Sequence, residues 1–332
     1  WEPMKQEAFE ARYAPVWEQF EAWVGVLAAG RRGRKDLDEI QRIGREFPAL
    51  YRQVCHHLAL ARARRYSSGL QQRLNELALD GHQHLYRART PFSTAIGRFF
   101  VNDFPACFRR HWRPAVVAHV LFYGAAFLMA IAIASSPELI YALVEPSQVT
   151  QMEAMYDPAN RRLGRERQAD TDLMMFGFYI YNNISIDFRT FAGGLLFGTG
   201  SVFFLAFNGL YFGAIATHIS VAGYVETFWG FVAGHSAFEL TALTIFGAAG
   251  LSLGYRAISP GQKGRWQAIR DAARDALPLI YGGTVLSVFA AFIEAFWSST
   301  TWPPVWLKYL VGLSLWLLVY AYLLLMGRNA AR

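Results

Sequence analysis

Residues 191–254 contain no lysine, arginine, aspartate or proline. The acidic and histidine residues of this segment are His218, Glu226, His235 and Glu239. A water-soluble domain needs polar faces along so long a segment, whereas membrane helices of about 20 apolar residues each do not. The segment therefore predicts consecutive membrane-spanning helices, with turns expected at Asn208-Gly209 and at 223–227.

Cysteine is also scarce, and the familiar catalytic motifs are missing. Cys55 and Cys107 are the only cysteines, without CxxC spacing, so we expect no disulfide framework and a reducing environment for the N-terminal part. The charged N-terminus is not followed by an apolar core, so no cleavable signal peptide is expected. No P-loop, dinucleotide-binding, nucleophile-elbow or HExxH pattern occurs, so we expect no catalytic residues and no cofactor, and the sequence favours a protein that is not an enzyme without deciding the question.

The charge of the chain is concentrated at one end. Residues 1–113 hold 19 Lys+Arg against 12 Asp+Glu, a net of +7, which equals the net charge of the whole chain. Basic segments beside membrane spans stay on the cytoplasmic side. Zinc-finger spacing, RNA-binding motifs and a basic heptad helix do not occur, so no nucleic-acid partner is expected.

The basic region 1–113 predicts a helical cytoplasmic domain, because its apolar residues recur at helical spacing between charges. We expect a helix break at Phe47-Pro48 and further helices over about 48–66 and 68–89. The histidines of this region have no spacing that completes a metal site, so no metal is expected there; they are His56, His57, His82 and His84.

Residues 92–113 mix aromatic residues with arginines. This pattern is typical of a helix that lies on the inner leaflet, with phenylalanines in the membrane and arginines facing lipid phosphate. The arginines concerned are Arg98, Arg109, Arg110 and Arg113. The alternative is an amphipathic helix packed on the cytoplasmic domain.

The remaining residues, 114–332, predict an all-α, polytopic membrane domain with about six spans. These fall at about 115–134, 190–207, 209–224, 228–253, 277–297 and 305–326. We expect 137–187 to be an extracytoplasmic loop and both termini to lie in the cytoplasm. Residues 173–184 are too short to span comfortably, and we expect them to lie flat on the outer surface. The alternative that they span the membrane stays open, and it would invert every later side assignment.

Glycines spaced by four residues recur in this domain. Glycine at such spacing lets two membrane helices approach closely. The pairs are Gly194/Gly198, Gly209/Gly213, Gly230/Gly234 and Gly250/Gly254. We expect these pairs at helix contacts, within one chain or between chains of a homo-oligomer.

Three ionisable residues fall inside the predicted spans. His235 and Glu239 share one helix face, and Glu294 lies in the same outer half of the membrane. Ionisable groups at such depth default to a functional hypothesis. We treat these three and Asn208 as a ligand or partner notch, while a proton or ion relay, a metal site and a purely structural hydrogen-bonded pair stay open. His-x-x-x-Glu supplies only two metal ligands, so no metal is expected without a third.

Other polar residues are assigned less important positions. We expect Asp187 and Arg189 at the outer entry to the second span. Asn182-Asn183 reads as a polar pair on the surface.

Several motifs together resemble the stage II sporulation protein M family of bacterial integral membrane proteins. They are Asn182-Asn183-Ile184, Gly193–Gly200, Asn208-Gly209-Leu210, Gly213-Ala214, Gly234-His235, Glu239-Leu240, Gly247–Gly254, Pro260-Gly261 and Ile293-Glu294 with Phe296 and Ser298. The N-terminal elements Tyr51-Arg52, 58–62 and 74–77 resemble the longer members of the family. Ser236 and Ala295 depart from it, since glycine is common at both positions.

The resemblance implies a multi-pass protein of the bacterial cytoplasmic membrane that acts as a scaffold in envelope remodelling. From the glycine-lined helices we expect this scaffold to be a homo-oligomer. Its implied partners are membrane lipid and envelope-complex proteins, such as an ATPase or peptidoglycan hydrolase assembly. The resemblance transfers no reaction. The alternative function is a transporter or channel for a small solute or lipid that uses the intramembrane His/Glu cluster, and an intramembrane metal-dependent hydrolase is a further alternative.

Overall fold

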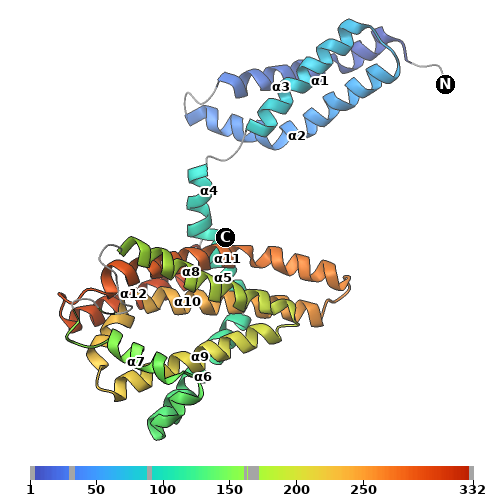
Figure 1. Ribbon diagram of the computed structural model, residues 1–332. Coiled ribbons are helices and arrows are strands. Elements are labelled where there is room, and N and C mark those ends of the chain that lie inside the picture. Colours follow the sequence, from blue (N-terminus) through green and yellow to red (C-terminus); the bar gives the residue numbers. More distant parts are fainter. Residues whose placement is uncertain (1–3, 30–33, 88–91, 161–162, 164–171, 329–332) are drawn as a thin grey trace. The chain divides into compact units, whose positions relative to one another are not determined.

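The computed structural model describes residues 4–29, 34–87, 92–160, 163 and 172–328. These residues form helices and no strands, which confirms the predicted all-α class. The chain divides into two compact units, 1–95 and 96–332 (Figure 1). Residues 96–113 therefore belong with the second unit, not with the N-terminal domain in which the sequence analysis placed them.

The first unit is built from α1 (Gln6–Ala29), α2 (Arg34–Ala63) and α3 (Ser68–Arg87). All three helices contribute to one apolar core, formed by Phe9, Trp17, Phe20, Ile43, Phe47, Val54, Leu58, Ala61, Leu70, Leu74 and Leu77. The unit therefore buries its apolar side chains without using the second unit.

The predicted helix break at Phe47-Pro48 is wrong, because α2 runs through Pro48 without interruption. A proline inside a helix costs about 3 kcal/mol. Burial of a large apolar side chain contributes about 1.5–3 kcal/mol. Ile43 and Phe47 before the proline, and Val54 after it, are buried on the same side of α2. A continuous helix keeps all of them in the core, and this outweighs the proline.

The boundary between the units falls within α4 (Phe92–Arg98), and the second unit continues with a π-helical turn η1 (Phe99–Asp103) and α5 (Phe104–Arg110). It continues with α6 (Trp112–Ser135), η2 (Pro137–Ala142), α7 (Pro146–Met155) and α8 (Asp172–Ala192). Next come η3 (Gly193–Leu195), α9 (Thr199–Val221) and α10 (Val225–Ile258). The last elements are α11 (Arg265–Ile293), η4 (Glu294–Ser298) and α12 (Val305–Leu325).

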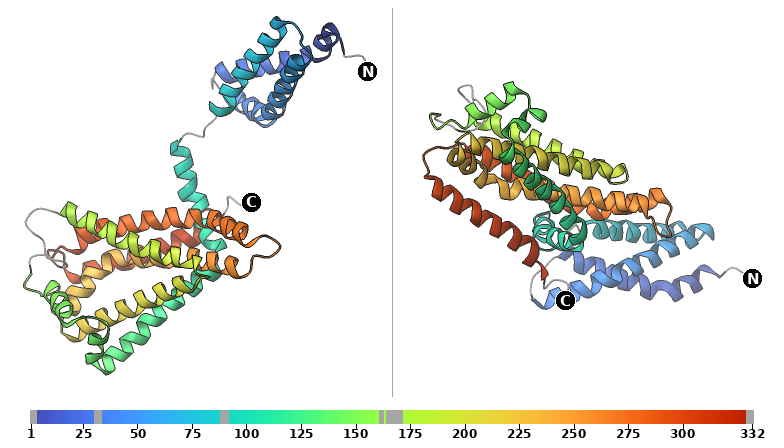
Figure 2. Two further views of the ribbon diagram at one scale, coloured as in Figure 1. Left: turned by 45° about the vertical axis from the view of Figure 1, so that its right-hand side comes forward. Right: turned by 90° about the horizontal axis from the view of Figure 1, so that it is seen from below.

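Five helical segments in the described part are long and apolar enough to cross a membrane. They are α6, α9, α10, α11 with η4, and α12. Helix α10 is the central one and contacts α6, α8, α9, α11 and α12 (Figure 2). Its residues 241–250 are all buried. The protein is therefore a multi-pass membrane protein with its core around α10.

The predicted turn at Asn208-Gly209 is wrong, because both residues lie inside α9. The Asn208 side chain donates a hydrogen bond of 2.7 Å to the Phe204 carbonyl of the same helix. Gly209 lies directly against the Phe122 carbonyl of α6, so this glycine serves close packing. The chain turns earlier, at 193–198, where Gly198 has φ of +83°. The predicted spans 190–207 and 209–224 are thus the end of α8, this turn and one helix.

Helix α8 settles the position of 173–184 relative to the other helices. It packs along α10 and α11, and its buried residues Met175, Tyr179, Asn183 and Asp187 are four residues apart. It is therefore a helix of the bundle. The predicted extracytoplasmic loop 137–187 ends where α8 begins, at Asp172.

The addition of α8 and the loss of the predicted turn at Asn208-Gly209 have opposite effects on the number of helices before α10. One helix is added at α8 and one is removed at α9, so the later helices keep their predicted direction. At one end of the bundle, Thr227 donates to the Tyr156 carbonyl and the Leu163 amide donates to the Ser299 carbonyl. At the other end, Gly198 meets Gly254.

The segment predicted as one interfacial helix, 92–113, is divided into α4, η1 and α5. Phe104, Cys107 and Phe108 of α5 are buried among α11 and α12, because Gly282 leaves room for the Phe104 ring. Arg109 donates to the carbonyls of Leu323 and Met326 at 3.0 and 2.7 Å, which satisfies the C-terminal end of α12. Its predicted contact with lipid phosphate is therefore replaced by a contact within the protein.

The spaced glycines lie mainly at helix contacts within the chain. A methyl group would overlap backbone atoms at Gly194, Gly209, Gly213 and Gly254, and the Ser201 hydroxyl at Gly250. Gly234 faces Ser298 and Trp297, whereas a methyl group at Gly230 would find ordinary contact distances. Most of these glycines therefore serve helix packing within one chain.

Candidate functional site

A cavity of about 270 Å³ lies inside the second unit. Helices α8 and α9 are joined by the 193–198 turn and diverge from it (Figure 2). Residues of both helices line the cavity, together with residues of α6, α10 and η4. Its polar lining consists of Tyr156, Asn182, Asn183, Asp187, Asn208, Tyr211, His235, Ser236, Glu239 and Glu294.

Helix α10 presents His235 and Glu239 to this cavity from successive turns. They lie about 15 and 21 Å from the first residue of the helix. The His235 Nε2 and Glu239 Oε2 atoms are 3.5 Å apart, and the two side chains are 6% and 31% exposed. Neighbours at this spacing share a helix face, so the sequence alone places them together.

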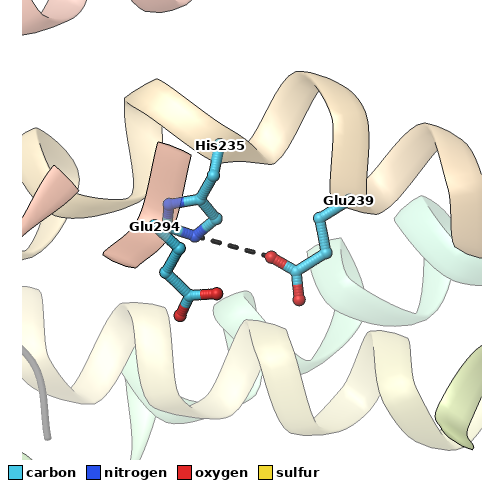
Figure 3. A group of neighbouring side chains, drawn as sticks. All are labelled: His235, Glu239 and Glu294. Carbon is cyan, nitrogen blue, oxygen red and sulfur yellow. Dashed lines mark ion pairs between the residues drawn. The ribbon is translucent and has the colours of Figure 1, made fainter. Parts of the chain in front are cut away.

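Glu294 reaches the same point from a different element. It is the first residue of the π-helical turn η4 that follows α11, and its side chain lies beside the His235 ring (Figure 3). Ligand atoms of His235, Glu239 and Glu294 all lie within 4.8 Å of one another. The structure thus brings together the three ionisable residues that the sequence analysis assigned to one notch.

The orientation of the His235 ring is fixed by a hydrogen bond at Nδ1, the ring nitrogen that does not face Glu239. Its Nδ1 atom is hydrogen-bonded to the Ser298 hydroxyl at 2.9 Å. The Ser298 carbonyl in turn accepts a hydrogen bond of 2.9 Å from Lys308 Nζ, which also donates to the Thr300 carbonyl at 2.5 Å. This leaves Nε2 as the ring nitrogen that faces Glu239.

Lys308 was not singled out by the sequence analysis. It is 2% exposed and belongs to α12. The signal was a lone lysine near the start of an otherwise apolar span, the kind of intramembrane charge that marks function or a buried partner.

Helix α8 supplies two further residues that the sequence analysis placed elsewhere. Asp187, expected at the entry to a span, is buried and accepts a hydrogen bond of 2.5 Å from the Ser287 hydroxyl. Asn183, expected on the surface, is only 4% exposed, whereas Asn182 is exposed. The four-residue spacing of Met175, Tyr179, Asn183 and Asp187 was the available signal.

Asn208 lies at the cavity too, although it is not at a turn. The cavity therefore collects all four residues of the predicted notch. Arg189, which was paired with Asp187 in the sequence analysis, is exposed and absent from the described lining.

The cavity carries three carboxyl groups and one imidazole, and the described lining includes no lysine or arginine. Carboxylates that share a site of low dielectric constant repel one another strongly. Such a group is stable only when protons or a bound cation offset the negative charge. The chemistry of the lining therefore suits a positively charged ligand.

Comparison with known proteins gives a match for each unit. The sequence profile of the stage II sporulation protein M family matches residues 118–299. The chain belongs to this family. A domain family of unknown function, DUF8413, matches residues 7–87, which lie in the first unit.

A curated relative of the chain is an uncharacterized protein, MJ0793, from Methanocaldococcus jannaschii. It is 28% identical over 123 residues, which cover 36% of this chain and 69% of the relative. No solved structure matches the chain.

Every residue that lines the cavity falls within the stage II sporulation protein M region. Several motifs that carry the resemblance meet there in space: Asn182-Asn183, Asn208, Gly234-His235, Glu239 and Glu294. The cavity is therefore a feature of the family region and not of the N-terminal unit.

Proposed function

We propose that the protein is a transporter that binds a small, positively charged solute in the cavity between α8, α9 and α10. The observation that carries this proposal is the convergence of His235, Glu239 and Glu294 in a cavity inside a membrane bundle. Ionisable side chains within a membrane line substrate paths or proton relays when they face a cavity.

The extent of the cavity favours a carrier over an open channel. Its lining on α10 runs from Phe228 to Leu243. Beyond it, residues 244–250 are all buried and pack in the core with Phe104, Leu279 and Leu323. Movement of a solute to the other end of the bundle thus requires a conformational change.

Uptake into proteoliposomes tests this function. Vesicles with trapped fluorescent reporters of protons, potassium or zinc should show faster uptake of one of these ions when they contain the full-length protein. Glu239→Gln should abolish the increase, because it removes a cavity charge. His218→Gln is a suitable control, since His218 pairs with Glu153 at 2.8 Å and does not line the cavity. Absence of uptake for every reporter would contradict the proposal.

A scaffold in an envelope-remodelling complex is the second candidate, in line with the family to which the chain belongs. The observation that favours it is the first unit, which has a core of its own and is thus suited to recruit partners. Helices α6 and α12 also keep wide apolar faces, because only 22% of the most apolar 18-residue stretch of each helix is buried. These faces suit contact with another membrane helix or with a second copy of the chain.

Co-purification from cells tests the scaffold. An ATPase or a peptidoglycan hydrolase should co-purify with the full-length protein in stoichiometric amounts. Leu74→Asp should remove that partner, because it places a charge in the core of the first unit. A partner that stays bound to this variant would show that the first unit does not recruit it.

A further inference from the structure

We propose that His235, Glu239 and Glu294 bind one divalent transition-metal ion, of which Zn²⁺ is the representative. This inference rests on the proposed function in one respect, namely that the cavity is the place where a cation is held. It names the class of that cation and the three atoms that hold it.

The three side chains already stand close to the geometry of a metal site. Ligands at about 2.0–2.1 Å from a tetrahedral ion are about 3.3 Å from one another. His235 Nε2 and Glu239 Oε2 are 3.5 Å apart. The full set of ligand atoms lies within 4.8 Å, so a shift of about 1 Å in the Glu294 carboxylate brings the three atoms to the spacing of a metal site. The third ligand that His-x-x-x-Glu lacks on its own is therefore present.

The surroundings of His235 are those of a ligand histidine. A ligand imidazole is usually held by a hydrogen bond from its second nitrogen, which fixes the ring. His235 has this bond to the Ser298 hydroxyl, and the Ser298 carbonyl is held by Lys308. The nitrogen left for a metal is the one that faces the carboxylates.

A second observation points to a ligand in the cavity. Asn183 lines it and is 4% exposed, yet its Nδ2 atom has no hydrogen-bond partner among the described residues. A buried amide N–H without a partner costs about 1–3 kcal/mol. A water molecule in the cavity, part of the shell of a bound ion, would accept this hydrogen bond.

The donor set selects the class of metal. One imidazole nitrogen with two carboxylate oxygens suits zinc and its first-row neighbours, whereas magnesium and calcium prefer oxygen alone. Asp187 adds a third carboxyl group to the lining, and the ammonium of Lys308 lies behind Ser298. When all three carboxyl groups are ionised, their charge of −3 and the +1 of Lys308 sum to −2, which a divalent cation neutralises.

The test is metal binding by the full-length protein in detergent, after removal of the affinity tag and treatment with a chelator. Titration with Zn²⁺ should show one ion per chain, and Ca²⁺ and Mg²⁺ should not compete. His235→Gln and Glu294→Gln should each weaken binding by at least about a hundredfold, because each removes a ligand. Ser298→Ala should weaken it by about ten- to a hundredfold, as loss of a positioning residue does.

His218→Gln is the matched control, since it disrupts another His–Glu pair within the same bundle and should leave binding unchanged. Titration with Co²⁺ gives a readout independent of mutation: visible bands of a tetrahedral or five-coordinate site are expected. Absence of stoichiometric binding, equal binding of Ca²⁺, or equal loss in the His218 variant would overturn the proposal.

The two proposals fail separately. Tight Zn²⁺ binding without ion uptake in vesicles would leave the metal site standing and refute transport. Uptake of protons or potassium without Zn²⁺ binding would leave transport standing and refute the metal site.

Discussion

At the scale of single residues, buried polar groups carry most of what is distinctive here. His57 is the clearest case in the first unit. It is 5% exposed in the first unit, and its Nδ1 atom accepts a hydrogen bond of 3.1 Å from the Trp17 indole. Burial, with a smaller contribution from neighbouring His56, lowers the pKa of His57 below its ordinary value of 6.5. Protonation would also break the bond from Trp17.

The first unit should therefore lose stability in mild acid. The unfolded chain binds a proton at about pH 6.5 that the folded chain does not, so the contribution of neutral His57 is fully present above that pH and falls below it. Hydrogen exchange of α1–α3, corrected for intrinsic rates, should accelerate between about pH 7 and pH 5. His57→Gln should reduce the pH dependence and His82→Gln, at an exposed position, should not. An unchanged dependence in His57→Gln would contradict this account.

Lys308 should be required for the stability of the end of the bundle at which α12 begins. Lys308→Met leaves the buried carbonyls of Ser298 and Thr300 without their donor, at a cost of about 1–3 kcal/mol. Lys263→Met removes an exposed ion pair with Asp271, and because solvent screens this pair its loss should have little effect on stability. Thermal unfolding in detergent should show a clear decrease for the first variant only. Equal decreases would mean that the buried amine has no special role.

At the scale of helices, the close contact of α6 with α9 depends on glycine. A methyl group at Gly213 would overlap the Ala126 carbonyl, whereas one at Gly124 on α6 would meet no atom within 4 Å. Gly213→Ala should destabilise the protein by about 1–3 kcal/mol, the usual cost of overpacking. Gly124→Ala should be neutral or stabilising by up to about 1 kcal/mol, since alanine favours helix. Thermal unfolding of both variants distinguishes the cost of overpacking from the gain in helix propensity. Equal effects of the two substitutions would contradict a special packing role for Gly213.

The sequence predicted helices well and their ends less well. Long apolar segments identify α6, α10, α11 and α12, because burial in lipid requires them. Asn208-Gly209 was wrongly predicted as a turn, because asparagine and glycine favour turns in water-soluble proteins and glycine also permits close helix contacts in a membrane. Helix α8 was hidden because its cavity face is polar, so its hydropathy is low for a span.

The candidate site was predictable only in part. His235 and Glu239 share a face by helical spacing, and Glu294 lies at the same depth. The contributions of Asp187, Asn183 and Lys308 required the packing of α8 and α12 against α10, which no local pattern contains.

At the scale of the whole molecule, the direction of the helices sets a pattern of sides. Leu196 and Gly261 should face one side of the membrane and Ala159 the other. One long helix, α8, lies between Ala159 and Leu196 in the chain, and α8, α9 and α10 lie between Ala159 and Gly261. The positive charge of 1–113 predicts that the first side is cytoplasmic.

Labelling of single cysteines tests this arrangement. Leu196→Cys, Gly261→Cys and Ala159→Cys, all at exposed positions, are made in a chain whose Cys55 and Cys107 are replaced by serine and alanine. A membrane-impermeant reagent added outside intact cells should label only the Ala159 variant. Labelling of Leu196 from the same side would exclude α8 as a spanning helix.

The most direct measurement of the central claim is anomalous diffraction at the zinc edge from crystals of the full-length protein grown with Zn²⁺. The account predicts one strong peak between the side chains of His235, Glu239 and Glu294, at about 2.0–2.2 Å from each ligand atom. A peak elsewhere on the protein, or a cavity that holds only water at saturating Zn²⁺, would contradict it.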